Sequence, residues 1–130
     1  MVHEWALSET IASYLEERFR GKRILEISLG IGELQNIDED ILVFSLRELL
    51  KSKGLGDPKI TTRRIPIHLR CRSCGFSWSI KINDFSEDLA EILHFVPEAI
   101  HSYIKCPRCG SRDYEILSGR GVYIENLVIE

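Results

Sequence analysis

"CRSCG" (71–75) and "CPRCG" (106–110) contain all four cysteines of this 130-residue chain. Two residues between paired cysteines let both sulfurs of a tight turn face one point, and the glycine after each pair permits a positive φ. Four thiolates are the preferred ligands of tetrahedral zinc, and a rubredoxin-like iron site is the alternative use of the same ligands. The spacing therefore predicts a zinc site formed by Cys71, Cys74, Cys106 and Cys109. A closed shell of four thiolates leaves no position for substrate, which indicates a structural role.

The segments around the two cysteine pairs predict a small metal-binding module. A strand is expected from 60 to 69, with an edge or a bulge at Pro66 because proline cannot donate to a ladder. Alternating apolar residues from 76 to 82 predict a hairpin arm, and a helical insert is expected over 87–104. We therefore expect a zinc-binding domain at 66–117, of rubredoxin or zinc-ribbon type.

The remaining residues predict a second module of two helices and a few strands. Apolar spacing indicates a helix over 4–20, and alternation indicates a strand over 25–29. A second helix is expected between an Asp38 N-cap and Gly54. With a closing strand, these elements predict an α+β fold with two helices on a small mixed three-stranded sheet. This domain would comprise 1–65 plus 118–130.

Composition and charge narrow the function classes. A net charge of −3 and a pI of about 5.8 argue against a general nucleic-acid binder. A zinc-ribbon module that binds nucleic acid or an acidic protein remains the alternative, through Arg63, Arg64, Arg70 and Arg72. No membrane span, signal peptide, nucleophile–base pair or phosphate loop is recognised, so a cytoplasmic protein that is not an enzyme is expected.

Five stretches in their order along the chain resemble the HypA family of nickel metallochaperones: "HEW" (3–5), "GEL" (32–34), the two cysteine pairs, and "GRGVYIENLVIE" (119–130). The insert "LHFVPEAIH" (93–101) looks like the archaeal branch. The resemblance implies structural zinc, nickel carried at the amino terminus, and delivery for [NiFe]-hydrogenase maturation, with urease as a further client in some organisms. It also implies a HypB-type nucleotide hydrolase and the hydrogenase large subunit as partners. A homodimer stays open, and neither membrane nor nucleic acid is expected.

The resemblance also implies nickel ligands. They are His3 with the preceding backbone of Met1 and Val2, together with Glu4 and, from the insert, His94. His101 lies seven residues after His94 and competes for the same role.

One residue departs from the family pattern, which begins Met-His-Glu. Here Val2 moves the histidine to third place. The amine, two amides and the imidazole of His3 then complete a square plane of nitrogens, which would hold nickel tightly and release it slowly. Removal of Met1 would restore the histidine to second place.

Overall fold

The computed structural model describes residues 2–130, with the backbone alone at Val2. The chain forms two compact units. The first comprises 2–30, 37–63 and 123–130, and the second comprises 31–36 and 64–122. No helix within residues 2–130 has the length and apolar character needed to cross a bilayer.

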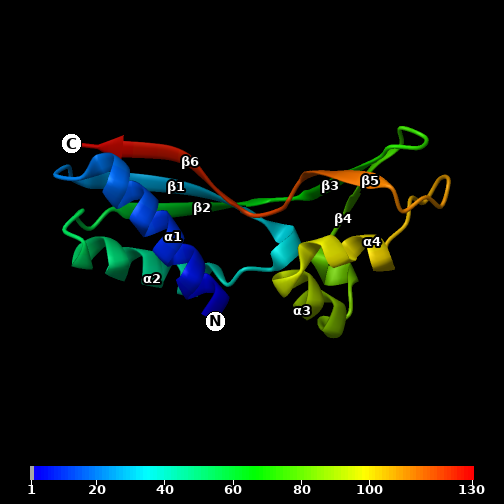
Figure 1. Ribbon diagram of the computed structural model, residues 1–130, viewed down its shortest axis with the longest axis horizontal. Coiled ribbons are helices and arrows are strands. Elements are labelled where there is room, and N and C mark those ends of the chain that lie inside the picture. Colours follow the sequence, from blue (N-terminus) through cyan, green and yellow to red (C-terminus); the bar gives the residue numbers. More distant parts are fainter. Residues whose placement is uncertain (1) are drawn as a thin grey trace. The chain divides into compact units, whose positions relative to one another are not determined.

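The first unit contains α1 (Val2–Phe19), β1 (Ile24–Gly32), α2 (Glu39–Ser52), β2 (Lys59–Ile65) and β6 (Val122–Ile129). The sheet order is β2-β1-β6, and β1 and β2 run in one direction while β6 runs in the other (Figure 1). This is the mixed three-stranded sheet expected from the sequence, and it confirms the α+β class.

The core of the first unit is aliphatic, and α1 and α2 pack against each other. Its fully buried side chains come from both helices and from β1: Ala12, Leu15, Ile27, Leu29, Leu42, Leu46 and Leu50. Helix α2 begins where the Asp38 side chain accepts the NH of Ile41 at 3.1 Å, which confirms the N-cap expected there.

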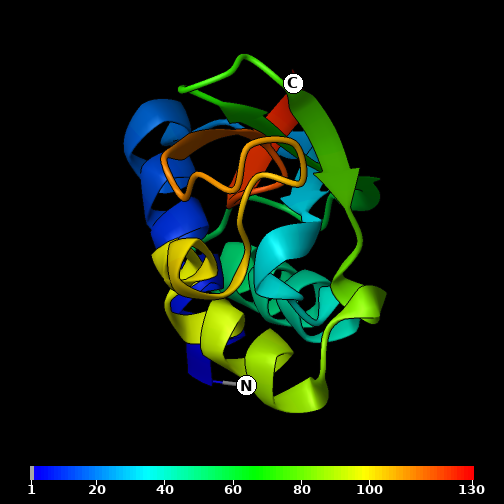
Figure 2. The ribbon, with the colours of Figure 1, turned by 90° about the vertical axis from the view of Figure 1, so that its right-hand side faces the viewer.

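The second unit contains a further three-stranded sheet and the helical insert. Strands β3 (Ile67–Cys71), β4 (Ser77–Ile80) and β5 (Tyr114–Ser118) form an antiparallel sheet in the order β4-β3-β5. The insert comprises short turns η2 (Ile82–Asp84) and η3 (Pro97–Ala99) with helices α3 (Glu87–Phe95) and α4 (Ile100–Tyr103). The turn η1 (Glu33–Gln35) also belongs to this unit and packs against α3 (Figure 2).

The prediction of a single strand over 60–69 is wrong in one respect. It is divided into β2 and β3 at Pro66, and the two parts belong to different sheets. Pro66 has no NH to donate, and its carbonyl accepts the hydroxyl of Ser118 at 2.8 Å. The proline therefore ends one ladder and allows the chain to begin another.

Two glycines allow the chain to cross itself inside the second unit. A Cβ at Gly32 would lie 2.3 Å from the carbonyl carbon and oxygen of Gly119. Gly119 has a φ of +97°, and its own Cβ would lie 2.7 Å from the Cα of Ile67. Leu34 donates its NH to the Gly119 carbonyl at 2.9 Å. The "GEL" segment is thus hydrogen-bonded to the turn before β6. At the crossing, Gly32 and Gly119 lie too close to the neighbouring backbone for either to carry a side chain.

Candidate metal-binding sites

The two cysteine pairs form knuckles of the same geometry. In the first, Cys71 ends β3 and its carbonyl accepts the NH of Gly75 at 3.0 Å. In the second, the Cys106 carbonyl accepts the NH of Gly110 at 2.9 Å. Both glycines have a positive φ, 77° and 78°, so the turn that glycine was expected to permit is present in each.

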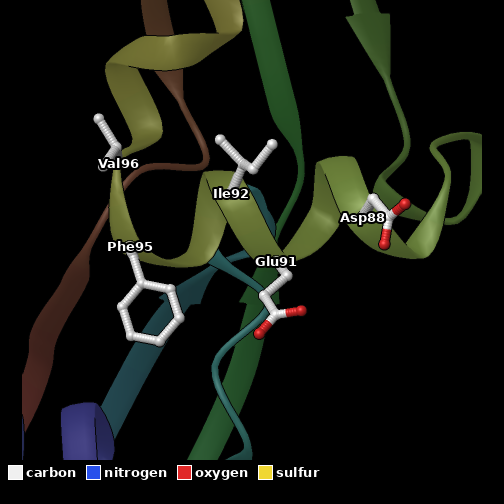
Figure 3. A pocket seen from close by; sticks show the side chains of 5 residues that line it. All are labelled: Asp88, Glu91, Ile92, Phe95 and Val96. Carbon is white, nitrogen blue, oxygen red and sulfur yellow. The ribbon is translucent and has the colours of Figure 1, made fainter.

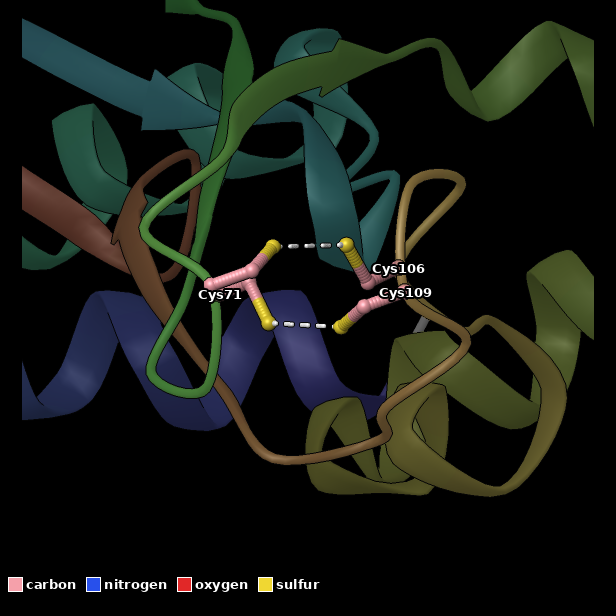
Figure 4. A group of neighbouring side chains, drawn as sticks. Cys71, Cys106 and Cys109 are labelled. Carbon is pink, nitrogen blue, oxygen red and sulfur yellow. Dashed lines mark hydrogen bonds between the residues drawn. The ribbon is translucent and has the colours of Figure 1, made fainter.

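The four thiols meet at one point. All four sulfurs lie within 4.8 Å of one another, and the group Cys71, Cys74, Cys106 and Cys109 is the candidate metal cluster found among residues 2–130. Two of the cross-knuckle sulfur distances are 3.6 Å for Cys71–Cys109 and 3.7 Å for Cys74–Cys106 (Figure 4). These are far above a disulfide bond of about 2 Å. Ligands at about 2.3 Å from a tetrahedral zinc ion lie about 3.8 Å apart, so the donor set and its spacing fit that ion.

The thiols differ in acidity because they share one confined space. Backbone NH groups, that of Cys74 first, lower the pKa of Cys71 to about 6. The NH of Ser111 acts to lower the pKa of Cys109, but the neighbouring sulfur of Cys71 and burial outweigh it and raise that pKa to about 12. Four thiolates cannot all carry charge here without a cation, so metal binding must release protons.

Contacts outside the sulfurs hold the two knuckles together. The hydroxyls of Ser73 and Ser111 lie 3.2 Å apart. Arg72 donates to the Asp113 carboxylate at 3.0 Å and to the Tyr114 carbonyl at 3.2 Å. These contacts connect the two knuckles in addition to the sulfurs.

At the amino terminus the structure places His3 and Glu4 in the first turn of α1. His3 is half-buried, whereas the Glu4 side chain is only 2% exposed. Glu4 accepts the NH of Asp38, the α2 cap, at 2.9 Å. Burial alone would raise the pKa of Glu4, but hydrogen bonds, including this one, lower it. Met1 and the side chain of Val2, which complete the implied nickel ligands, lie outside the described residues.

Both histidines of the insert direct Nδ1 at a backbone carbonyl. His94 Nδ1 lies 2.6 Å from the Gln35 carbonyl oxygen, and His101 Nδ1 lies 3.0 Å from that of Arg112. The His101 ring also stacks on Tyr114, with centroids 4.4 Å apart. The sequence did not predict these contacts of Gln35 and Tyr114, because both residues contact partners that are distant along the chain.

The outer surface of α3 carries a shallow hollow of about 490 Å³ (Figure 3). Apolar and acidic side chains line it: Asp88, Glu91, Ile92, Phe95 and Val96. Its carboxylates do not join a cysteine or histidine in a metal-ligating group among residues 2–130. The hollow is thus distinct from the cysteine centre.

Two of the four arginines of the alternative interpretation, Arg63 and Arg72, form ion pairs with carboxylates of the chain. Arg63 donates to both oxygens of Glu125, at 3.1 and 2.5 Å. Arg72 is bound to Asp113, as described above. Arg70 lies on β3 opposite Ser77 and Glu115.

Comparison with known proteins gives a consistent result. The sequence family described as "Hydrogenase/urease nickel incorporation, metallochaperone, hypA" matches residues 2–129. Proteins named hydrogenase maturation factor HypA from Thermococcus onnurineus and Pyrococcus abyssi are 39% and 37% identical, each over 99% of this chain and 96% of the relative. The solution structure of the Ni metallochaperone HypA from Helicobacter pylori has a TM-score of 0.53 at 15% identity, covering 95% of this chain and 94% of that one, and supports the fold. This chain therefore belongs to the HypA family, the nickel metallochaperones of hydrogenase maturation.

Proposed function

We propose that the cysteine centre holds a structural zinc ion and that nickel is a separate, exchangeable cargo of the amino terminus. The observation that supports zinc most directly is the pair of cross-knuckle sulfur distances, 3.6 and 3.7 Å, close to the edge of a zinc–thiolate tetrahedron. With four thiolates bound, the ion has no position left for a substrate, so it fixes the shape of the second unit and supports no reaction.

For nickel we propose His3, the terminal amine and the intervening backbone as the primary ligands. His3 is carried on a helix whose next residue, Glu4, is tied to the start of α2, so the first turn of α1 is anchored. The terminal amine and backbone belong to Met1 and Val2. Two further candidate ligands are the carboxylate of Glu4 and the imidazole of His94 in the insert. In this proposal residues 1–65 plus 118–130 carry the primary nickel ligands, and residues 66–117 carry the zinc ligands.

The proposed partners follow from the family. Nickel would be exchanged with a HypB-type nucleotide hydrolase and passed to the large subunit of a [NiFe]-hydrogenase, with urease as a further client. Four reduced thiols require a reducing compartment, which supports the cytoplasm. A homodimer remains compatible with these roles.

Two metal measurements test the proposal on the full chain. Metal analysis should find one zinc ion per chain, and X-ray absorption should find four sulfur neighbours at about 2.3 Å. Nickel titration of the zinc-loaded protein against a competing chelator should show tight binding that His3→Ala abolishes. His68→Ala is the matched control, because His68 is a histidine of β3 hydrogen-bonded to Ser79 at 2.6 Å.

The same titration should compare chains with and without Met1. We expect both forms to bind nickel and only the processed form to release it readily, because it leaves one position of the square plane open. Equal nickel binding by the wild type and His3→Ala would exclude the amino-terminal site and leave the zinc unit as the place to seek function.

A further inference from the structure

The ring of His94 is held in a defined protonation form by the backbone. Its Nδ1 lies 2.6 Å from the carbonyl oxygen of Gln35. A carbonyl oxygen only accepts hydrogen bonds, so Nδ1 must carry the proton. In a neutral imidazole the lone pair then resides on Nε2. This is the arrangement in which a metal-ligating histidine donates its other ring NH to a backbone carbonyl.

The same two residues are joined a second time in the opposite direction. The Gln35 side-chain amide donates to the His94 carbonyl at 3.3 Å, across 59 residues of sequence. His94 lies in the last turn of α3, where carbonyl groups have no partner within the helix. Gln35 thus satisfies the end of the helix with its side chain and orients the ring with its main chain.

The position of Gln35 is itself fixed by the second unit. Its neighbour Leu34 is fully buried in a cluster that includes Leu93 of α3. The NH groups of Gly32 and Leu34 donate to the carbonyls of Gly121 and Gly119, at 2.8 and 2.9 Å. The η1 turn is therefore anchored on both sides of the chain crossing, and it presents Gln35 to the end of α3.

We propose that Gln35 is the positioning residue of His94, holding the imidazole with Nδ1 protonated so that Nε2 is the nitrogen offered to nickel. This inference rests on the proposed role of His94 as a nickel ligand. Beyond that role, the inference specifies which ring nitrogen binds nickel and which residue determines that choice. Gln35 does not touch the ion; it limits the rotation and tautomer of the group that does.

The first test measures the tautomer directly. Long-range nitrogen–proton NMR on the zinc-loaded, nickel-free full chain, at a pH where His94 is neutral, distinguishes a protonated from an unprotonated ring nitrogen. We expect a protonated Nδ1 and an unprotonated Nε2 for His94. Free histidine favours the opposite tautomer, so a protonated Nε2 would overturn the proposal without reference to nickel.

The second test measures nickel affinity in a double-mutant cycle. Loss of an outer hydrogen-bond partner typically weakens metal binding 10- to 100-fold. Because Gln35→Ala keeps the backbone carbonyl, we expect the lower end, a loss of about 10-fold. Asn83→Ala, which removes an exposed amide of η2, should have no effect. Adding Gln35→Ala to His94→Ala should produce no further loss.

The cycle separates the two ideas that it tests. If His94→Ala weakens nickel binding and Gln35→Ala behaves like Asn83→Ala, His94 is a ligand and the side-chain part of the positioning role is wrong, while the tautomer measurement decides the part played by the Gln35 carbonyl. If His94→Ala itself changes nothing, the ligand role of His94 fails, and the positioning role fails with it. The zinc content of each variant, expected to match the wild type, shows that the second unit is intact.

Discussion

Tyr114→Phe tests how the chain is held just before the second knuckle. Tyr114 opens β5 and is fully buried, with its hydroxyl 3.0 Å from the Ile100 carbonyl and 2.9 Å from the Ile104 carbonyl. Ile104 stands two residues before Cys106. A hydroxyl has one proton, so the two carbonyls share a single donor. The Ile100 carbonyl also accepts the NH of Ile104 at 2.9 Å and keeps that partner in the variant.

The expected loss of stability is therefore that of one buried hydrogen bond, about 1–2 kcal/mol, and not of two. Phenylalanine fills the same ring volume, so no cavity is added. Guanidinium unfolding of the zinc-loaded protein should be followed in a Trp5→Phe background. The fluorescence then comes from Trp78 alone, whose ring centroid lies 5.3 Å from that of Tyr114. Tyr103→Phe, at a side chain 54% exposed, is the matched control.

Alkaline pH gives an independent check. Burial raises the pKa of Tyr114 from 10.0 to about 12. A raised folded-state pKa means that this contribution is complete below pH 10 and is lost as the pH rises towards 12. The stability difference between the wild type and Tyr114→Phe should therefore shrink over that range. A Tyr114→Phe effect equal to that of Tyr103→Phe would refute the reasoning, and a loss above about 4 kcal/mol would require a mechanism beyond one hydrogen bond.

Gly32→Ala places a Cβ 2.3 Å from the backbone of Gly119, so thermal unfolding should show a loss of about 1–3 kcal/mol; an unchanged melting curve would contradict the close crossing. Cys106→Ser should leave less than one zinc ion per chain and abolish the near-UV signal of the second unit, while far-UV dichroism retains α1 and α2; full zinc occupancy would argue against a four-thiolate site. Arg63→Gln removes the hydrogen bonds that lower the pKa of Glu125, so carbon-13 NMR titration should find that pKa raised; an unchanged midpoint would mean that the pair does not persist in solution.

The features that the sequence predicts correctly are those set by neighbours along the chain. The helix start at Asp38 depends on a side chain and an NH three residues away. The knuckle turns depend on Gly75 and Gly110, each directly after its cysteine pair. The four-cysteine centre joins two such local units, and the chemistry of thiolates supplies the rest. Short-range rules were therefore sufficient to predict that the four cysteines converge.

The features that the sequence does not reveal depend on contacts between distant segments. Pro66 indicates an irregularity, but only the pairing partners show that the chain changes sheets there. Gly32 gives a weak hint of close packing, and its partner Gly119 lies far along the chain. The Gln35–His94 pair likewise combines two residues with no shared pattern. Hydrophobic periodicity places a residue on a face of its own element, and it does not identify the segment that the face meets.

Glu4 illustrates the same limit at the proposed nickel site. Near a free amino terminus, a carboxylate beside a histidine suggests a ligand. In the structure Glu4 has a different role, which is to anchor the start of α2. The residue is only 2% exposed, and its carboxylate accepts the NH of Asp38, the α2 cap, at 2.9 Å. A carboxylate has two oxygens with about four lone-pair sites, so Glu4 could bind nickel only through the sites that the Asp38 NH leaves unused. Unpaired burial of the NH would cost about 1–3 kcal/mol, so retention of the hydrogen bond is favoured.

Substitution of Glu4 by glutamine and by alanine distinguishes a nickel ligand from a residue that only positions the first turn of α1. Glu4→Gln keeps an oxygen that accepts the Asp38 NH, so nickel affinity should remain near wild type, whereas Glu4→Ala should weaken it by loosening the first turn of α1. The lowered pKa of Glu4 adds stability above its ordinary value of 4.5, and this stability is lost as the pH falls below that value. Acid unfolding of Glu4→Gln should lack that contribution. Chelator competition with nickel decides between the roles, since equal losses in both variants would make the carboxylate a ligand and refute the positioning role.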